Sequence, residues 1–224
     1  MFDREIKLIG IDNYNKIKSK TVAVVGVGGV GGYAVEALVR AGIEDIIIVD
    51  YVVVDITNLN RQIIAFQNNI GMYKTDVIKE RINNINPNCN VTIINKKLDE
   101  FNLNLLFENK IDYLIDACDT VKVKEQLIIE CINRNIKHIS CMGTGNKLNP
   151  ELLSITDIRK TNYDPLAKKI RKFVKDNKIK EKVMVISSTE EPKKIDGVIS
   201  SISYVPSVAG LLCASYVIND IIKS

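Results

Sequence analysis

The stretch from residue 22 to residue 50 constrains the fold of this chain more than any other. An apolar run at residues 22–25 leads into the glycine-rich loop GVGGVG at residues 26–31, and a second apolar run at residues 46–49 ends on Asp50. A helix-forming stretch separates the two runs. Strand, glycine turn, helix, strand and carboxylate follow one another in this order in a βαβ unit that holds a nucleotide.

Each glycine of the loop meets a separate physical demand. Gly26 allows a sharp turn off the strand, Gly28 lets a phosphate approach the backbone, and Gly31 allows the helix to pack close to the sheet. The helix N-terminus then offers unpaired N–H groups to the phosphates. Asp50 can accept hydrogen bonds from the ribose hydroxyls, although a carboxylate there can also simply end the strand. We predict a nucleotide site from these residues and Gly29.

Apolar runs and helix-like stretches alternate along the rest of the chain. We expect a short N-terminal helix over residues 4–17, interrupted near Gly10. Further strands are predicted at residues 91–94, 113–116, 136–142, 153–156 and 183–186, and helices at residues 72–85, 121–135, 164–176 and 206–223. Because the connections are long enough for right-handed crossovers, the pattern predicts a doubly wound, mostly parallel α/β sheet with helices on both faces. We expect one domain over residues 1–224, in which residues 1–145 form the nucleotide-binding core and residues 146–224 form a basic extension associated with substrate or dimer.

Composition argues against several classes of protein. The 224 residues are 46% hydrophobic and carry a formal charge of +4, which is ordinary for a single soluble domain. The longest apolar stretches, such as residues 46–54, fall short of the ~20 residues of a membrane span, and the N-terminus lacks the layout of a signal peptide. The five cysteines include no Cys-x-x-Cys pair and His138 is the single histidine, so a disulfide framework or a zinc site is not expected. We therefore expect a cytoplasmic location.

Four short motifs carry a resemblance to a known family. They are GVGGVG at residues 26–31 with Asp50 beyond it, NLNRQ at residues 58–62, GMYK at residues 71–74 and DACD at residues 116–119. In their order and spacing, these motifs resemble the E1-like adenylating family, which contains the MoeB and ThiF proteins and the ubiquitin-activating enzymes. The resemblance implies a Rossmann-like fold of the E1/ThiF type that binds ATP.

The chemistry of adenylation explains why such residues would gather at a triphosphate. A carboxylate oxygen attacks the α-phosphate of ATP and expels pyrophosphate, so negative charge grows on the phosphate oxygens and fixed cations stabilise it. Arg61 and Lys74 supply two cations, and Asn58 and Gln62 add neutral donors. Asp119 is positioned to hold Mg²⁺ through its oxygens. Each charge taken alone is more often a solvated surface residue, but their common spacing favours a site.

Three other residues are weaker candidates. In the family, the N-terminal arginine, here Arg4, reaches the γ-phosphate in the partner subunit, which implies a homodimer. Glu5 stands where that family usually has glutamine. Cys141 ends a strand near the expected site, and His138 is the only imidazole that could act as a base. For both, an ordinary packing role is the favoured interpretation.

Two segments outside the nucleotide unit narrow the expected substrate. Residues 156–167, TDIRKTNYDPLA, and residues 188–190, STE, resemble the subfamily of tRNA threonylcarbamoyladenosine dehydratases. The resemblance implies that ATP adenylates the threonine carboxylate of N6-threonylcarbamoyladenosine at tRNA position 37, and that the carbamoyl group of the same modification closes a ring and releases AMP. Groups tethered in one molecule gain an effective concentration of ~10⁵ M or more, so no protein nucleophile is needed.

A tRNA substrate predicts a basic surface. Residues 159–182 are rich in lysine and arginine, and on a helix Lys168, Arg171, Lys172 and Lys175 share one face. Such a face can release counterions from an RNA backbone, although an amphipathic helix with a solvated face gives the same pattern.

Two other functions stay open at this point. An E1-like enzyme could activate the C-terminus of a small, ubiquitin-like sulfur-carrier protein, although many such enzymes carry cysteines that bind zinc. Independently of this alternative, a sulfur-transfer protein could act as a partner of the chain. A NAD-binding oxidoreductase or a nucleotide sensor would use the glycine loop and Asp50. It would leave Arg61, Lys74 and Asp119 without a shared purpose.

Overall fold

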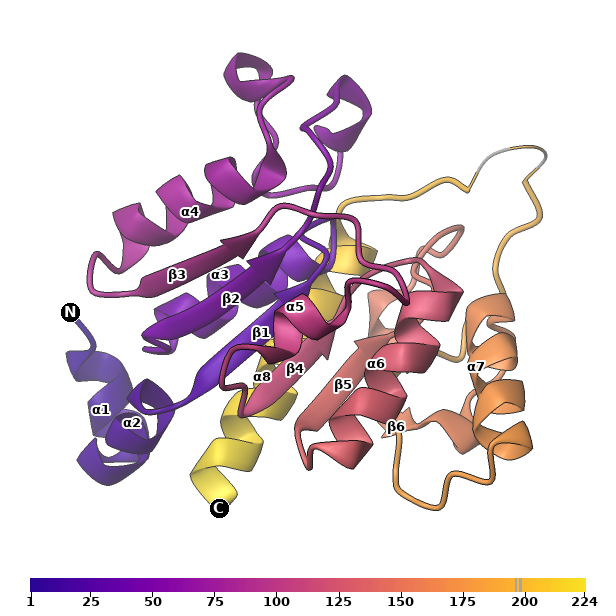
Figure 1. Cartoon of the computed structure of the whole chain (residues 1–224). Coiled ribbons are helices and arrows are strands. Elements are labelled where there is room, and N and C mark those ends of the chain that lie inside the picture. Colours follow the sequence, from indigo (N-terminus) through magenta and orange to yellow (C-terminus); the bar gives the residue numbers. More distant parts are fainter. Residues whose placement is uncertain (196, 198) are drawn as a thin grey trace.

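One sheet runs through the middle of the computed structural model (Figure 1). The structure describes residues 1–195, 197 and 199–224, and in this part of the chain seven strands form the sheet in the order β3-β2-β1-β4-β5-β7-β6. The strands are β1 (Thr21–Val25), β2 (Asp45–Val49), β3 (Asn90–Ile94), β4 (Tyr113–Asp116), β5 (Lys137–Cys141), β6 (Leu153–Asp157) and β7 (Met184–Ser188). All neighbouring pairs are parallel except β6 with β7, which confirms the predicted mostly parallel sheet.

Helices cover both faces of this sheet (Figure 1). They are α1 (Asp3–Ile9), α2 (Ile11–Lys18), α3 (Gly31–Arg40), α4 (Lys74–Ile85), α5 (Asn104–Phe107), α6 (Val121–Asn133), α7 (Pro165–Asp176) and α8 (Tyr204–Lys223). Because side chains alternate between the two faces of a strand, Val22 and Val24 of β1 join the core formed with α3, α4 and α8, whereas Ala23 and Val25 join the core formed with α5 and α6. A third apolar cluster connects α7 with β7.

The strand order decides which end of the sheet can bind a ligand. From β1 the chain crosses through α3 to β2 on one side, and from β4 it crosses through α6 to β5 on the other. In such sheets, ligands bind beyond the carboxyl ends of the two strands at which the connections diverge. At this end, Gly26 N donates to Val49 O at 2.7 Å and Ala117 N donates to Val25 O at 2.9 Å. The loops after β1 and β4 therefore start next to each other.

The helices predicted at both ends of the chain are present in the structure. The N-terminal helix is interrupted at Gly10, as expected, where φ is +85°. Helix α8 is long and apolar enough to cross a membrane by length and composition alone, which the expectation based on residues 46–54 did not consider. In this structure α8 packs into the core, and a Cβ on Gly210 would lie 2.2 Å from Val30 O on the neighbouring α3 segment. This close packing accounts for the apolar residues on the buried face of α8.

Candidate functional site

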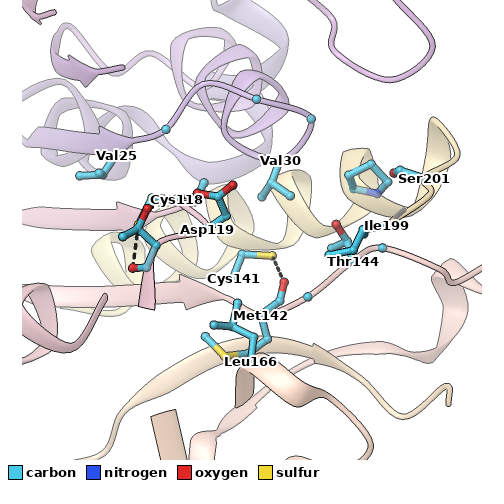
Figure 2. A pocket seen from close by; sticks show the side chains of 18 of the residues that line it. Val25, Val30, Cys118, Asp119, Cys141, Met142, Thr144, Leu166, Ile199 and Ser201 are labelled. Atoms are coloured by element: carbon cyan, nitrogen blue, oxygen red, sulfur yellow. Dashed lines mark hydrogen bonds between the residues drawn. The ribbon is translucent and has the colours of Figure 1, made fainter. Parts of the chain in front are cut away.

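A cavity of about 860 Å³ lies beyond the carboxyl ends of β1, β2, β4 and β5 (Figure 2). Most of the predicted site residues line it together: Gly26, Gly28, Gly29, Asp50, Asn58, Arg61, Gln62, Lys74 and Asp119. Gly31 lies just behind the lining, where a Cβ would fall 1.8 Å from Gly26 O. The fourth glycine therefore lets α3 start directly against the loop, as its position in the motif predicted.

Asp50 holds the glycine loop in shape. Its Oδ2 accepts a hydrogen bond from Val27 N at 2.9 Å and its Oδ1 accepts one from Val52 N at 2.9 Å. Gly26 has φ +88°, and a Cβ there would lie 2.9 Å from Ala117 O, so no other residue fits this turn without displacing the neighbouring loop. A carboxylate oxygen can accept more than one hydrogen bond. Asp50 thus retains the capacity for ribose hydroxyls while it braces the loop, a second role that the motif did not reveal.

Two cations converge on this cavity. Arg61 Nη1 donates to Thr57 O at 2.8 Å and to Asn60 Oδ1 at 2.9 Å, so its own loop holds the guanidinium. Lys74 is only 7% exposed. Burial lowers the pKa of Lys74 and the charge of Arg61 adds to this effect, while nearby carboxylates including Asp50 and Asp119 oppose it. These mutual influences place Lys74 within electrostatic reach of both the arginine and the carboxylates.

The neutral donors of the NLNRQ motif are buried beside these cations. Asn58 Oδ1 accepts from Asp55 N at 3.2 Å and completes the capping of the short helix at residues 56–58. Gln62 is 6% exposed, and its Oε1 is buried without a partner among the described residues. Asn58 thus shapes the turn, whereas the amide of Gln62 keeps an unused hydrogen-bonding atom at the cavity.

Asp119 is exposed at the cavity and lies within hydrogen-bond distance of Thr120 Oγ1 alone among the described residues, at 3.4 Å. The described residues contain no group of three or more histidine, cysteine or acidic side chains that could hold a metal by themselves. Mg²⁺ is usually bound through one or two carboxylates together with substrate phosphates. The donor set at Asp119 therefore fits a metal that arrives with a nucleotide.

A buried ion pair beneath the cavity was not predicted. Lys124 of α6 is fully buried, and its Nζ donates to Asp116 Oδ2 at 3.0 Å, Ser140 Oγ at 3.0 Å and Cys141 O at 2.9 Å. Burial alone would lower the pKa of Lys124, but the charge and hydrogen bond of Asp116 together with the thiols of Cys118 and Cys141 outweigh it, so the pKa is raised. The cluster ties the ends of β4 and β5 to α6. Its signal was present, because Lys124 stands among the apolar residues on the inner face of the predicted helix.

The contacts of Asp116 give it a structural role. Its Oδ1 accepts from Cys118 N at 3.2 Å, which closes the turn after β4, and Ser140 Oγ donates to its Oδ2 at 2.6 Å. The carboxylate is 1% exposed. Asp116 therefore cannot take the metal-binding place that Asp119 offers.

The weaker candidates lie less favourably for chemistry. Arg4 is exposed on α1, at the end of the sheet opposite the cavity, and does not line the cavity within one chain (Figure 1). His138 is buried on β5 away from the cavity lining, and burial lowers its pKa. Cys141 lines the cavity but is 4% exposed and directs its Sγ to Met142 O at 3.3 Å (Figure 2). Burial raises the pKa of Cys118 strongly, which makes this thiol a poor nucleophile.

The predicted basic residues of α7 lie in one surface groove of about 660 Å³, hereafter the α7 groove. Its basic lining consists of Arg159, Lys168, Arg171, Lys172, Lys175 and Lys178. Two of the four predicted residues are engaged within the chain: Arg171 donates to Thr161 O at 2.8 Å, and Lys172 pairs with Asp176 at 2.9 Å. Arg171 is therefore also an anchor for the segment before α7.

Four lysines that line the cavity were not predicted as site residues, namely Lys96, Lys97, Lys147 and Lys169. Lys96 and Lys97 follow β3, where no local pattern distinguishes them from surface charges. Lys147 ends a loop with two glycines after β5, a pattern that could have indicated a second loop at the same edge of the sheet. Lys169 was counted only as part of the basic helix.

The fold and the cavity define a nucleotide-binding α/β protein whose cations suit adenylation. The chain belongs to the ThiF family, whose model matches residues 2–223. It is 40% identical to tRNA threonylcarbamoyladenosine dehydratase of Bacillus subtilis, over 99% of this chain and 94% of that protein. The crystal structure of the Escherichia coli tRNA N6-threonylcarbamoyladenosine dehydratase in complex with AMP superposes with a TM-score of 0.93 at 33% identity, covering 99% of this chain and 94% of that chain. The same enzyme in complex with ATP gives a TM-score of 0.93, covering 99% and 93%.

Proposed function

We propose that this chain is an ATP-dependent dehydratase that adenylates the threonine carboxylate of N6-threonylcarbamoyladenosine at position 37 of tRNA and promotes closure of the ring. The observation that carries the proposal is the gathering of Arg61, Lys74 and Asp119 with the glycine loop at one cavity. Relatives named for this activity match almost the full chain, which supports the choice of substrate.

The reaction uses groups that the substrates bring with them. A threonine carboxylate oxygen attacks the α-phosphorus of ATP, the bond from that phosphorus to the bridging oxygen breaks, and pyrophosphate leaves. Arg61 and Lys74 neutralise charge on the phosphate oxygens, and the backbone N–H groups at the start of α3 add to this stabilisation. The carbamoyl group then attacks the acyl carbon, loses a proton and expels AMP. No protein nucleophile takes part, in agreement with the raised pKa of Cys118 and the burial of Cys141.

Mg²⁺ is the metal that the site fits. Asp119 would hold it together with phosphate oxygens of ATP, and it would supply charge neutralisation at the triphosphate. Replacing Asp119 with Asn should raise the Mg²⁺ concentration needed for half-maximal adenylation while ATP-free protein keeps its thermal stability, because Asp119 is exposed and carries little of the fold. An unchanged Mg²⁺ requirement would show that the metal rests on other groups.

The remaining assignments concern partners and organisation. We propose that the α7 groove binds the tRNA backbone, in the cytoplasm, and that residues 1–224 act as one domain. A homodimer would bring Arg4 to the partner's triphosphate. The segment of residues 51–73 favours such an assembly, because it exposes the apolar side chains of Ile56, Phe66 and Tyr73 by 59%, 51% and 48%. A sulfur-transfer protein is a further expected partner, and its addition to the nucleoside mass assay described below should raise the rate of cyclisation.

The direct experiment measures the mass of the modified nucleoside. The protein is incubated with ATP, Mg²⁺ and tRNA that carries threonylcarbamoyladenosine, and the tRNA is then digested to nucleosides. A product lighter by one water, together with release of AMP and pyrophosphate, is expected. An unchanged nucleoside in the presence of folded protein that binds ATP would refute the proposal.

The other functions considered above are less well supported. Activation of a sulfur-carrier protein would give pyrophosphate exchange only in the presence of a protein that ends in Gly-Gly. A NAD-dependent function would give thermal stabilisation by NAD and none by ATP with Mg²⁺. Neither explains the basic α7 groove next to the cavity.

A further inference from the structure

The cavity extends past the nucleotide-binding residues to a second end, hereafter the β5 end. It is lined by the loop of residues 142–147 after β5 and by Asp164, Leu166 and Lys169 around the first turns of α7. Met142 and Leu166 belong to one apolar cluster and lie together in Figure 2, on the side away from Val25. The β5 end therefore combines an apolar wall with charged side chains, as sites for small ligands usually do.

A buried ion pair builds the β5 end. Lys147 Nζ lies 3.4 Å from Asp164 Oδ2 and donates to Gly143 O at 2.8 Å, and both charged side chains are 1% exposed. Asp164 Oδ1 also accepts from Ala167 N at 2.8 Å and so caps α7. A Cβ on Gly143 would lie 2.8 Å from Asp164 Oδ2, so a larger residue would push the pair apart. The pair holds the loop against α7, and its two charges cancel.

Lys169 is the charge at the β5 end that nothing in residues 1–195, 197 and 199–224 balances. Its side chain is exposed and lines the cavity, and it makes neither a hydrogen bond nor an ion pair with a described residue. Its neighbour Lys168 lies in the α7 groove instead. An unbalanced cation beside an apolar wall suits a ligand that joins a flat ring to a carboxylate.

Helix α7 connects this pocket with the groove proposed for RNA. With a rise of about 1.5 Å per residue, Lys169 and Lys172 are about 5 Å apart along the helix axis. A strand whose phosphates contact Lys168 or Lys172 in the α7 groove therefore passes within about one nucleotide of the β5 end. Enzymes that act on a base commonly turn its nucleotide out of the strand into such a pocket.

We propose that the β5 end receives the modified adenosine and that Lys169 recognises its threonine carboxylate before adenylation. This inference rests on the proposed function and names the part of the site that selects the modification. In this arrangement the purine lies against Met142 and Leu166, and the carboxylate is held between Lys169 and the α-phosphate of ATP. Lys147 and Asp164 act as positioning residues for the loop, since the charge of each is already balanced by the other.

The test compares binding of two tRNAs that differ only in the threonylcarbamoyl group, with the full chain and a non-hydrolysable ATP analogue. The wild type should prefer the modified tRNA. Lys169→Ala should reduce this preference about ten-fold or more and leave the affinity for the unmodified tRNA nearly unchanged, because a charge-assisted contact is lost. Lys169→Arg should restore most of it. The matched control Lys168→Ala removes a cation from the α7 groove and should weaken the binding of both tRNAs by the same factor.

Three results for Lys169→Ala would overturn the inference. The variant could prefer the modified tRNA as strongly as the wild type does, it could bind both tRNAs more weakly by the same factor, or it could lose ATP affinity in parallel with tRNA affinity. Cyclisation by the wild type, measured alongside as the mass of the nucleoside, separates this inference from the proposed function. If the wild type cyclises the nucleoside and Lys169→Ala still discriminates, only the role of Lys169 is wrong. If the wild type does not cyclise it, the proposed function itself is wrong.

Discussion

Two buried lysines, one at the cavity and one beneath it, differ in their environment from the lysines of the α7 groove. Lys74 and Lys124 are 7% and 0% exposed, and hydrogen bonds to Asp116, Ser140 and Cys141 hold the ammonium of Lys124 in place. Lys168, Lys172 and Lys175 are exposed on one helix. A buried charge must be paired or neutralised by its surroundings, whereas an exposed one interacts through water and salt. The same residue type therefore supports defined geometry in one region and long-range attraction in the other.

This difference suits the two tasks proposed for the regions. Stabilising charge on a reacting phosphate requires cations that are already in place, because the benefit depends on distances of a few ångströms. Holding an RNA backbone requires a density of positive charge and tolerates mobile side chains. Mutations in the two regions should therefore have different sizes and different dependences on salt and pH.

The largest effect is expected at the buried pair. Lys124→Met should lower the free energy of unfolding by about 3–5 kcal/mol, because it leaves the carboxylate of Asp116 buried without its cation. Urea unfolding measures the loss. Lys122→Met is the matched control on the same helix, since the Lys122 side chain is 88% exposed and pairs with Glu125 only at 3.6 Å, so less than about 0.5 kcal/mol should be lost. Similar losses in both variants would mean that burial does not distinguish these lysines.

The next largest effect concerns the cations at the cavity. Arg61→Ala and Lys74→Ala should each slow adenylation about 10²-fold or more, because each removes charge that stabilises the transition state. Release of AMP and pyrophosphate under saturating ATP gives the rate, and thermal unfolding checks that the fold is intact. Lys79→Ala, on the exposed face of the same helix α4, should leave the rate unchanged. Normal rates in both site variants would remove Arg61 and Lys74 from the mechanism.

Local patterns in the sequence were sufficient for much of the fold. The alternation of apolar runs and helix-like stretches predicted β1, α3 and β2, because strands and helices each bury residues with a regular period along the chain. The glycine loop marked the boundary between β1 and α3. The same motifs predicted that Asp50, Arg61 and Lys74 share a cavity, which the structure confirms as a matter of position. Their chemical roles remain predictions.

Contacts between distant segments could not be predicted in this way. The strand pattern at β6 has no feature that gives its direction, so its antiparallel pairing with β7 at the edge of the sheet was not expected. The partners of Lys124 come from β4 and β5, and the contact of Arg171 with Thr161 bridges a loop. Such contacts depend on the packed structure, and a charged residue among apolar ones was the only local sign of them.

A smaller effect is expected in the α7 groove. The triple variant Lys168→Ala, Lys172→Ala and Lys175→Ala should weaken tRNA binding and reduce the slope of log Kd against log salt by about 2–3, if each lysine contacts one phosphate. Arg171 is left in place because it anchors Thr161. ATP affinity should not change. A fall in ATP affinity equal to that in tRNA affinity would assign α7 to the fold rather than to RNA.

The smallest effect is a difference in pH dependence between the two regions. Burial lowers the pKa of Lys74, so its ammonium at the cavity begins to lose its proton at a pH below the usual lysine value of about 10.4. ATP affinity should therefore fall as the pH rises toward that value. The pKa of Lys172 in the α7 groove is instead raised by its hydrogen bond to Asp176, so the contribution of Lys172 to tRNA affinity should stay constant over the same range.

The variant Lys74→Arg tests the origin of this pH dependence, since arginine remains charged throughout the range. It should bind ATP with an affinity that no longer depends on pH, even if the affinity itself is lower because the guanidinium does not fit the buried position of an ammonium.

The stability of the ligand-free wild-type protein should change with pH in the opposite direction to its ATP affinity. A lysine with a lowered pKa binds fewer protons in the folded than in the unfolded state, so the contribution of Lys74 makes the free energy of unfolding rise with pH between its folded pKa and about 10.4. Calorimetric titration of ATP and urea unfolding across this range would measure both. Parallel pH profiles for the wild type and Lys74→Arg would show that another group titrates at the cavity.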